Sequence, residues 1–311
     1  MDANFNLPLN YPLVLDDREY KIIDCIGSGG SSKVYKAKNL TTGYYVLIKE
    51  LFPADTNERK WGGIRNKEKL VIPEEYENDF ENLKERTRRE VQTVYSLKIE
   101  NTIKNGGITV DNSSWFQKYH GPYEANNTLY SVIDSNSGDT LYDIMSAENK
   151  AKNFKNFTDI CECILRILEA LEPMHLKGYL HLDISPDNIY VLKQEVDGKR
   201  IHNLIDFNSA YNIKSTEKSN IKFTYKKGYS APELEDIGSA ADVKDGDLKD
   251  ATDLYSVVAI FFELLTGRLY NDDEHHDEDE FTKGANVVNG EDKESYLFGM
   301  SSLLRNCQRI S

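Results

Sequence analysis

The order of strand-like and helix-like segments constrains the fold of this chain more than any other feature of its sequence. Runs rich in β-branched and aromatic residues come first, at residues 20–26, 33–38 and 44–50. An apolar repeat then predicts a long helix over residues 74–99. A further strand-like run follows at 129–133, and two strongly apolar helical patterns come later, at 160–174 and 251–265. Because strands come first and helices later, the sequence predicts an α+β protein with two lobes.

The same pattern predicts where the chain divides. Residues 1–19 are interpreted as an extended lead-in, 20–135 as the N-terminal lobe and 136–311 as the C-terminal lobe. The polar stretch 52–73 carries two prolines and two glycines, which is typical of an inserted loop. The acidic run 271–280 contains two adjacent histidines, but a solvated loop is the preferred interpretation over a metal site.

Composition excludes several classes of function. The 311 residues carry 38 basic and 52 acidic side chains, a formal charge of −14, whereas duplex DNA and anionic membranes bind basic surfaces. No apolar run has the length of a membrane span, and the first residues lack the features of a signal peptide. The four cysteines show no paired zinc spacing, which favours a reducing compartment. We therefore expect a cytoplasmic protein with no nucleic-acid partner and no direct membrane insertion; the oligomeric state is left open.

A glycine-rich turn lies between the first two predicted strands, with the sequence IGSGGSSKV at residues 26–34. Backbone N–H groups in such a turn can approach phosphate oxygens, although many Gly/Ser turns only close a hairpin. Lys49 ends the next apolar strand, where its ammonium can either reach phosphates beneath the turn or point into solvent.

A lysine in that position needs a carboxylate partner, and the long helix offers Glu81, Glu85 and Glu90. Glu85 has charged and polar neighbours, whereas Glu90 has Leu83 and Val94 on its side of the helix. A carboxylate on the apolar face needs a partner because burying a lone charge is costly. The pattern predicts an ion pair between Glu90 and Lys49.

Polar residues cluster in two later segments, HLDISPDN at residues 181–188 and LIDFN at 204–208. Asn188 and Asp206 supply oxygen ligands of the kind that Mg²⁺ prefers. Asp183 is a candidate acceptor for the proton of an attacking hydroxyl. Each residue alone is also compatible with ordinary turn chemistry.

Taken together, the ordered motifs resemble the protein-kinase family, in which a glycine loop, a strand lysine, a helix glutamate, a catalytic loop and an Asp-Phe-Gly motif follow one another. The sequence APE at residues 231–233 matches the end of the activation segment, and Asp253 matches the aspartate that holds the catalytic loop. The resemblance covers residues 20–270 and is strongest to Ser/Thr-type kinases of Gram-positive bacteria. It implies a bilobal fold with a small antiparallel β-rich N-lobe, one long helix, and a mainly helical C-lobe that looks shortened.

The resemblance also implies a role for each matching position. Residues implied to contact ATP are Gly27, Ser28, Gly29, Val34, Leu47, Lys49, Ile133, Asp134, Asn136 and Tyr190. Lys49 would contact the α and β phosphates, Asp134 and Asn136 would offer backbone groups to adenine, and Tyr190 would form the pocket floor. Asp183 would deprotonate the acceptor hydroxyl, while Asn188 and Asp206 would hold Mg²⁺.

The sequence departs from the family pattern around the nucleotide. Ser32 replaces the third glycine of the loop, and Asn208 replaces the glycine of Asp-Phe-Gly. Leu47 stands where alanine is usual and adds bulk above the adenine, while Tyr190 adds bulk below it.

Other departures concern the catalytic loop and the C-lobe. Leu182 replaces the loop arginine that receives an activating phosphate in the family, and Ser185 replaces a lysine that assists at the transferred phosphate. Lys226 or Lys227 can supply the missing charge, with solvated lysines as the alternative. Beyond residue 265 the only helix candidate is 293–309, which suggests a truncated or excised domain.

The preferred hypothesis is ATP- and Mg²⁺-dependent phosphorylation of Ser or Thr hydroxyls on protein substrates, with Asp183, Lys49, Glu90 and Lys226 as the catalytic set. A pseudokinase scaffold with weak or no nucleotide binding is the main alternative, favoured by Leu47, Tyr190 and Ser185. A small-molecule kinase is a further alternative, which the peptide-platform motifs at 231–233 and Asp253 disfavour.

Overall fold

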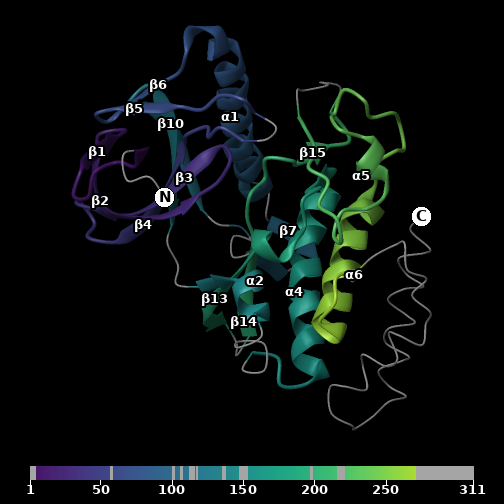
Figure 1. Cartoon of the computed structure of the whole chain (residues 1–311). Helices are drawn as coiled ribbons and strands as arrows, with labels where there is room; N and C mark the ends of the chain where they lie inside the picture. Colours follow the sequence, from purple (N-terminus) through teal and green to yellow (C-terminus); the bar gives the residue numbers. More distant parts are fainter. Residues whose placement is uncertain are drawn as a thin grey trace, which may run out of the picture. The chain divides into compact units, whose positions relative to one another are not determined.

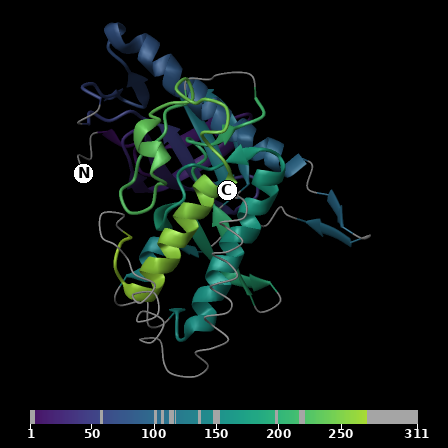
Figure 2. The same ribbon diagram turned by 90° about the vertical axis from the view of Figure 1, so that its right-hand side faces the viewer.

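The computed structural model describes residues 5–56, 59–99, 102–105, 108–111, 116, 118–134, 138–146, 153–196, 199–215 and 221–270. The chain forms two compact units (Figures 1 and 2). Unit 1 comprises Met1–Glu100 with Gln117–Asn136, and unit 2 comprises Asn101–Phe116 with Ser137–Ser311. The two-lobed α+β class predicted from the sequence is confirmed.

Unit 1 is built on a six-stranded antiparallel sheet with the order β1-β2-β3-β4-β10-β9. Its strands are β1 (Pro12–Leu15), β2 (Arg18–Ser28), β3 (Ser32–Asn39), β4 (Tyr45–Leu51), β9 (Tyr119–Ala125) and β10 (Thr128–Asp134). The four runs expected to be strands correspond to β2, β3, β4 and β10, whereas β1 and β9 were not predicted. One side of the sheet buries the aromatic and aliphatic core, including Tyr20, Ile22, Tyr35 and Ile48.

The long helix α1 (Glu77–Ile99) follows a single 3-10 turn at Glu74–Tyr76. Its buried residues keep the helical spacing expected from the sequence: Phe80, Leu83, Val91, Val94 and Leu97. Helix α1 contacts β4, β9 and β10 of the same unit, which brings the buried Glu90 to the sheet.

Two segments expected to lie outside regular structure are part of unit 1. Residues 1–19 were interpreted as a lead-in, but β1 pairs with β2, and Leu7, Leu13 and Leu15 are buried. The sheet therefore begins before residue 20. Within the stretch 52–73, interpreted as a loop, β5 (Ile64–Asn66) and β6 (Lys69–Val71) form a hairpin. Buried Trp61 and Leu70 fix this insert against Phe80 and Leu129, so apolar packing overrides the polar composition.

Unit 2 contains two long helices that lie side by side, α4 (Phe157–Leu176) and α6 (Asp250–Thr266) (Figure 1). Both were predicted, and their ends have identifiable causes: Gly178 follows α4 with φ of 81°, and Gly267 caps α6 with φ of 72°. The shorter elements are α2 (Leu141–Met145), the 3-10 turn Pro186–Asn188 and α5 (Glu233–Asp236).

Small sheets complete unit 2. Strands β11 (Gly138–Thr140), β13 (Ile189–Val196) and β14 (Lys199–Leu204) form one antiparallel sheet, while β12 (Tyr179–Leu180) pairs with β15 (Tyr211–Asn212) and β7 (Thr102–Asn105) with β8 (Ile108–Asp111). The loop that carries Asp183 follows β12, and the loop that carries Asp206 follows β14. The predicted acidic run 271–280 and the helix candidate 293–309 lie outside the described residues. Within the part that is described, no helix is long and apolar enough to cross a membrane.

Candidate active site

Strand β4 presents Lys49 and Leu47 on one side of the sheet, because Val46, Ile48 and Glu50 between and beside them are buried on the other. The register places Gly27 opposite Val34 and Val34 opposite Lys49 on successive strands. Cross-strand partners share a face of the sheet, so the start of the glycine-rich turn, Val34 and Lys49 form one row.

The predicted ion pair between Lys49 and Glu90 is present. The ammonium Nζ of Lys49 lies 2.9 Å and 3.1 Å from the two carboxylate oxygens of Glu90. The Glu90 side chain is only 1% exposed and also accepts a hydrogen bond from the Tyr119 hydroxyl at 3.4 Å. Glu85 instead pairs with Arg88 at 2.6 Å on the exposed side of α1. The burial of Glu90 on the apolar side of α1, against the exposure of Glu85, explains why Glu90 holds the lysine.

The strand expected to border adenine is β10, where Ile133 is buried opposite Leu47 in the register. The backbone N–H of Asp134 donates to the carbonyl of Lys118 at 3.0 Å, so that N–H does not serve a nucleotide. The side chain of Asp134 lies 3.1 Å from His120 Nε2. Asn136 lies outside the described residues.

In unit 2, the loop that carries Asp183 is fixed by Asp253 at the start of α6. The fully buried carboxylate of Asp253 accepts hydrogen bonds from the N–H groups of His181 (2.9 Å) and Leu182 (2.8 Å). His175 Nε2, on α4, lies 2.8 Å from the same carboxylate. Burial opposes the charge of Asp253, but the hydrogen bond and charge of His175 lower the pKa of Asp253 below its usual value. His175 was not predicted, because nothing in the spacing of α4 separates it from a surface histidine.

Asp183 and Asn188 are joined directly. The Asn188 amide Nδ2 donates to the Asp183 carbonyl at 2.8 Å and to its carboxylate Oδ2 at 2.9 Å. Burial, followed by the negative charge of Asp206, raises the pKa of Asp183 to about 7. A carboxylate with a pKa near neutrality is suited to accept and release a proton.

Backbone strain marks both loops. Leu182, just before Asp183, has φ of 59°, and Asp206 has φ of 63°. Residues with a side chain rarely adopt this left-handed region, and such outliers cluster at functional sites. Asn208 Nδ2 donates to Asp206 Oδ1 at 2.6 Å, so the residue in the position of the motif glycine helps to orient the carboxylate.

The donor set of these loops fits Mg²⁺. Asn188 uses its amide nitrogen on Asp183, which leaves the amide oxygen for a cation. The mutual repulsion of Asp183 and Asp206 is the kind that a divalent cation relieves. Mg²⁺ takes few protein ligands and several from water and phosphate, so two side-chain oxygens are a sufficient protein contribution.

Lys226 approaches the loop as predicted. Its Nζ lies 2.9 Å from the hydroxyl of buried Ser185 and also forms an ion pair with Asp187 that was not predicted. The positive charge of Lys226 acts to lower the pKa of Asp183, against the effect of burial. Lys226 thus places a positive charge next to Ser185, the neutral residue that replaces the family's lysine.

A model of the protein kinase domain matches residues 20–296. The chain belongs to the protein kinase family. Similar proteins include a probable serine/threonine-protein kinase of Clostridium perfringens, 25% identical over 253 residues, and serine/threonine-protein kinase C of Synechocystis, 28% identical over 259. These alignments cover 80% and 83% of this chain but only 29% and 41% of the relatives, so the chain spans less than half of their length.

Solved structures give the same answer for the fold. The protein kinase domain resembles PpkA-294 in its apo form with a TM-score of 0.61 and 21% identity, covering 85% of this chain and 80% of that one. The BubR1 kinase domain gives a TM-score of 0.56 at 18% identity, over 85% and 67% of the respective chains.

Two residues of this kinase domain make contacts that the sequence did not predict. Tyr190, expected at the pocket floor, donates its hydroxyl to the Gly138 carbonyl at 3.0 Å, which ties the ring to β11. Glu233 accepts a hydrogen bond from the Thr252 hydroxyl at 2.6 Å. Tertiary contacts between α5 and α6 thus provide an anchor that the sequence did not identify.

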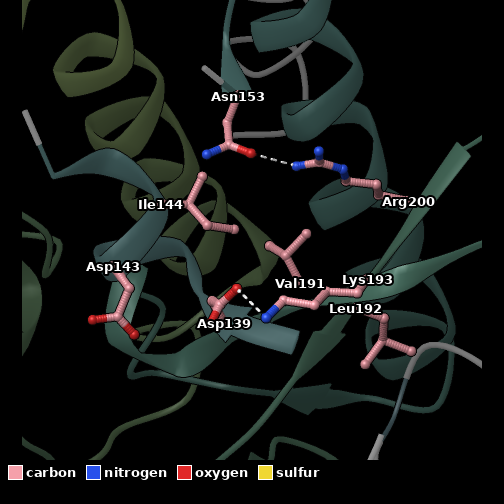
Figure 3. Close-up of a pocket in the computed structure, with 8 residues that line it drawn as sticks. All are labelled: Asp139, Asp143, Ile144, Asn153, Val191, Leu192, Lys193 and Arg200. Carbon is pink, nitrogen blue, oxygen red and sulfur yellow. Dashed lines mark hydrogen bonds and ion pairs between the residues drawn. The ribbon is translucent and has the colours of Figure 1, made fainter. Parts of the chain in front are cut away.

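A separate hollow of about 270 Å³ lies beside β13 in unit 2 of the kinase domain (Figure 3). Two pairs of its polar residues are engaged with one another: Lys193 lies 3.4 Å from Asp139, and Arg200 lies 2.7 Å from Asn153. None of the residues in the predicted catalytic set lines it.

Proposed function

We propose that the protein transfers the γ-phosphoryl group of ATP to Ser or Thr hydroxyls of proteins, with Mg²⁺ bound by Asn188 and Asp206. The observation that carries the proposal is Asp183: it is bonded to Asn188, its pKa is raised to about 7, and its loop is anchored by buried Asp253. A geometry held in this way before substrate arrives favours phosphoryl transfer, in which positioning and charge stabilisation supply most of the catalysis.

The residues divide the work as follows. Asp183 accepts the proton of the acceptor hydroxyl while the hydroxyl oxygen forms a bond to the γ-phosphorus. The bond from that phosphorus to the β–γ bridging oxygen breaks, which releases ADP. Lys49, oriented by Glu90, binds the α and β phosphates, and Lys226 places positive charge beside the transferred group. Mg²⁺ supplies further charge to the phosphates when bound.

A scaffold without transfer activity is the second candidate, and Leu47 is the residue that favours it. Its side chain shares the sheet face with Lys49 and adds three heavy atoms relative to alanine. Overpacking of this kind costs about 1–3 kcal/mol, or roughly tenfold to hundredfold in affinity. Binding weakened by this amount still permits catalysis, because Lys49, Glu90, Asp183, Asn188 and Asp206 are all present.

The test is transfer of label from radiolabelled ATP, with Mg²⁺, to a generic protein substrate. We expect the protein as given to label Ser and Thr, and Asp183→Asn to leave only residual labelling. Calorimetric titration with ATP, with and without Mg²⁺, separates the two candidates. Mg²⁺-dependent binding without transfer to any protein substrate would leave the scaffold as the function, and the absence of binding would contradict both the nucleotide site and the enzyme.

A further inference from the structure

The glycine-rich turn of unit 1 is bonded to the insert, defined here as residues 52–73. The backbone N–H of Phe52 donates to the carbonyl of Ser31, and the N–H of Ala54 donates to the carbonyl of Gly30, each at 2.9 Å. The turn itself is closed by a bond from Gly29 N–H to the Ser32 carbonyl at 2.8 Å. The outer edge of the turn therefore lies against a second segment.

One side chain of the insert makes the most extensive contact with the turn. The Arg59 guanidinium donates through one nitrogen to the Gly30 carbonyl, and through the other to the Ser31 hydroxyl at 2.9 Å. It also donates to the Ala54 carbonyl at 3.3 Å. The planar guanidinium can satisfy these separate acceptors at once, which the ammonium of a lysine cannot do with the same geometry.

The position of Arg59 is itself fixed. Its backbone exchanges hydrogen bonds with Thr56, at 2.7 Å through the carbonyl and 3.0 Å through the N–H. The guanidinium lies over the Trp61 ring at 5.4 Å, and Trp61 stacks on Tyr76 with a centroid separation of 5.3 Å. Tyr76 ends the 3-10 turn that leads into α1, so Arg59 connects the glycine-rich turn to the base of that helix.

A second arginine, Arg86 on α1, lies near enough to Arg59 to be affected by its charge. Burial and the charge of Arg59 lower the pKa of Arg86, which lies one helical turn before Glu90 on α1. Among the described residues no carboxylate pairs with Arg86, and its buried Nε has no hydrogen-bond partner. A polyanion next to the turn would relieve the repulsion between Arg59 and Arg86.

We propose that Arg59 is a positioning residue for the nucleotide: it holds the glycine-rich turn, through Gly30 and Ser31, in the conformation that receives the phosphates of ATP. This inference rests on the proposed function, because ATP is the ligand of the turn. Ser32 occupies the position of a family glycine, so the inner end of this turn already has less backbone freedom, and the insert fixes its outer end.

The experiment compares Arg59→Ala, Arg59→Lys and the adjacent control Lys60→Ala in steady-state kinetics with varied ATP. Lys60 is exposed and takes no part in the turn. We expect the KM for ATP to rise about tenfold in Arg59→Ala with kcat within about twofold, the size of effect typical of a charge-assisted hydrogen bond. The KM of Arg59→Lys should lie between those of Arg59→Ala and the unmodified protein. The double variant Ser31→Ala with Arg59→Ala should have nearly the same KM as Arg59→Ala alone.

Hydrogen exchange of the backbone amides at residues 27–32 gives a second readout that needs no turnover. Exchange should be faster in Arg59→Ala than in Lys60→Ala, while thermal melting shows that both fold. If Arg59→Ala and Lys60→Ala have the same exchange rates and the same KM for ATP, the inference is overturned. That result would not contradict the proposed function. If the unmodified protein transfers no phosphate, the proposed function fails instead, and the exchange comparison still tests the contact of Arg59 with the turn. Arg59→Lys serves both readouts if Arg59→Ala does not fold.

Discussion

Lys49 and Glu50 are neighbours in the sequence, yet they face opposite sides of β4 and have different surroundings. On one side, Lys49 is partly exposed and forms an ion pair with Glu90. On the other, Glu50 is fully buried and accepts hydrogen bonds from Arg65 (2.9 Å at one oxygen), Tyr35 (2.9 Å) and Tyr130 (2.5 Å). Alternation along a strand therefore separates a face that can meet a ligand from one that cannot.

The ion pairs on the two sides of β4, Arg65–Glu50 and Lys49–Glu90, differ in how far they are buried. Both members of the Arg65–Glu50 pair are nearly inaccessible, at 2% and 0% exposed, and they join the insert to the sheet. Burial and the charge of Glu50 raise the pKa of the Tyr35 and Tyr130 hydroxyls, which therefore remain donors. A closed network of this kind anchors structure, whereas the Lys49 side chain is partly exposed, and its ammonium is the group proposed to bind phosphates.

Breaking the buried face should give the largest effect. Arg65→Ala leaves the Glu50 charge buried without its cation, and we expect the free energy of unfolding to fall by about 3–5 kcal/mol. Urea denaturation followed by circular dichroism measures the change, with Lys69→Ala in the same hairpin as the exposed control. A loss below about 1 kcal/mol would show that water or another group replaces Arg65.

Breaking the open face should affect transfer rather than folding. Lys49→Met removes the cation proposed to bind the α and β phosphates, so phosphoryl transfer should fall by about 10² to 10³, as for the loss of a single stabilising group in other enzymes. The variant should still unfold in one cooperative transition. Lys36→Met, on the exposed part of β3, is the control that should retain activity. Normal transfer by Lys49→Met would remove Lys49 from the catalytic set.

Asp183 sharpens the comparison through pH, because burial raises its pKa to about 7. Below that pH the carboxyl is protonated and cannot accept a proton, so kcat/KM should fall about tenfold per pH unit below about pH 7 and level off above it. Asp183→Asn should show only residual transfer without this break. A profile that stays flat down to about pH 5 would contradict the assigned role.

The same shift predicts a stability difference with a definite sign. A carboxyl whose folded pKa is raised stabilises the fold while protonated, and this contribution is lost as pH rises from about 4 to about 7. Asp183→Asn should therefore gain melting temperature relative to the unmodified protein at about pH 8 but not at about pH 4. The raised pKa of His175 affects both proteins alike and cancels in the difference.

A second lysine, in unit 2, tests whether transfer can be lost without loss of nucleotide binding. Lys226→Ala removes the ammonium at Ser185, and we expect kcat to fall about tenfold to hundredfold while the KM for ATP changes by less than about twofold. Lys227→Ala, exposed and adjacent, is the matched control. An unchanged kcat would assign Lys226 only to the ion pair with Asp187.

The smallest effect is expected at Leu47, on the same face as Lys49. Leu47→Ala should tighten ATP binding by about tenfold, the lower end of the cost of overpacking, because it removes bulk beside the proposed adenine position. Calorimetric titration with ATP and Mg²⁺ measures the change, and Leu40→Ala on the surface is the control. Weaker binding in Leu47→Ala would mean that the leucine packs favourably against the nucleotide.

The local parts of this protein were determined by its sequence. Periodicity alone predicted α1, α4, α6 and the central strands, since each depends on residues close together in the chain. The pairing of Glu90 with Lys49 also followed from the sequence, because only Glu90 combined a charge with an apolar helix face. The resemblance to protein kinases then assigned Asp183, Asn188 and Asp206 to one site.

Tertiary structure decided the rest. Strand β9 carries Gly121 and Pro122, which read locally as a break, and it forms because the edge of the sheet tolerates a residue without an N–H donor. The short strand β1, the β5–β6 hairpin, and the contacts of Arg65 with Glu50 and of Arg59 with the glycine-rich turn all depend on partners distant in sequence. Local patterns do not encode such partners, because a short segment gains its stability from the surface it packs against and a buried charge from the group it meets there.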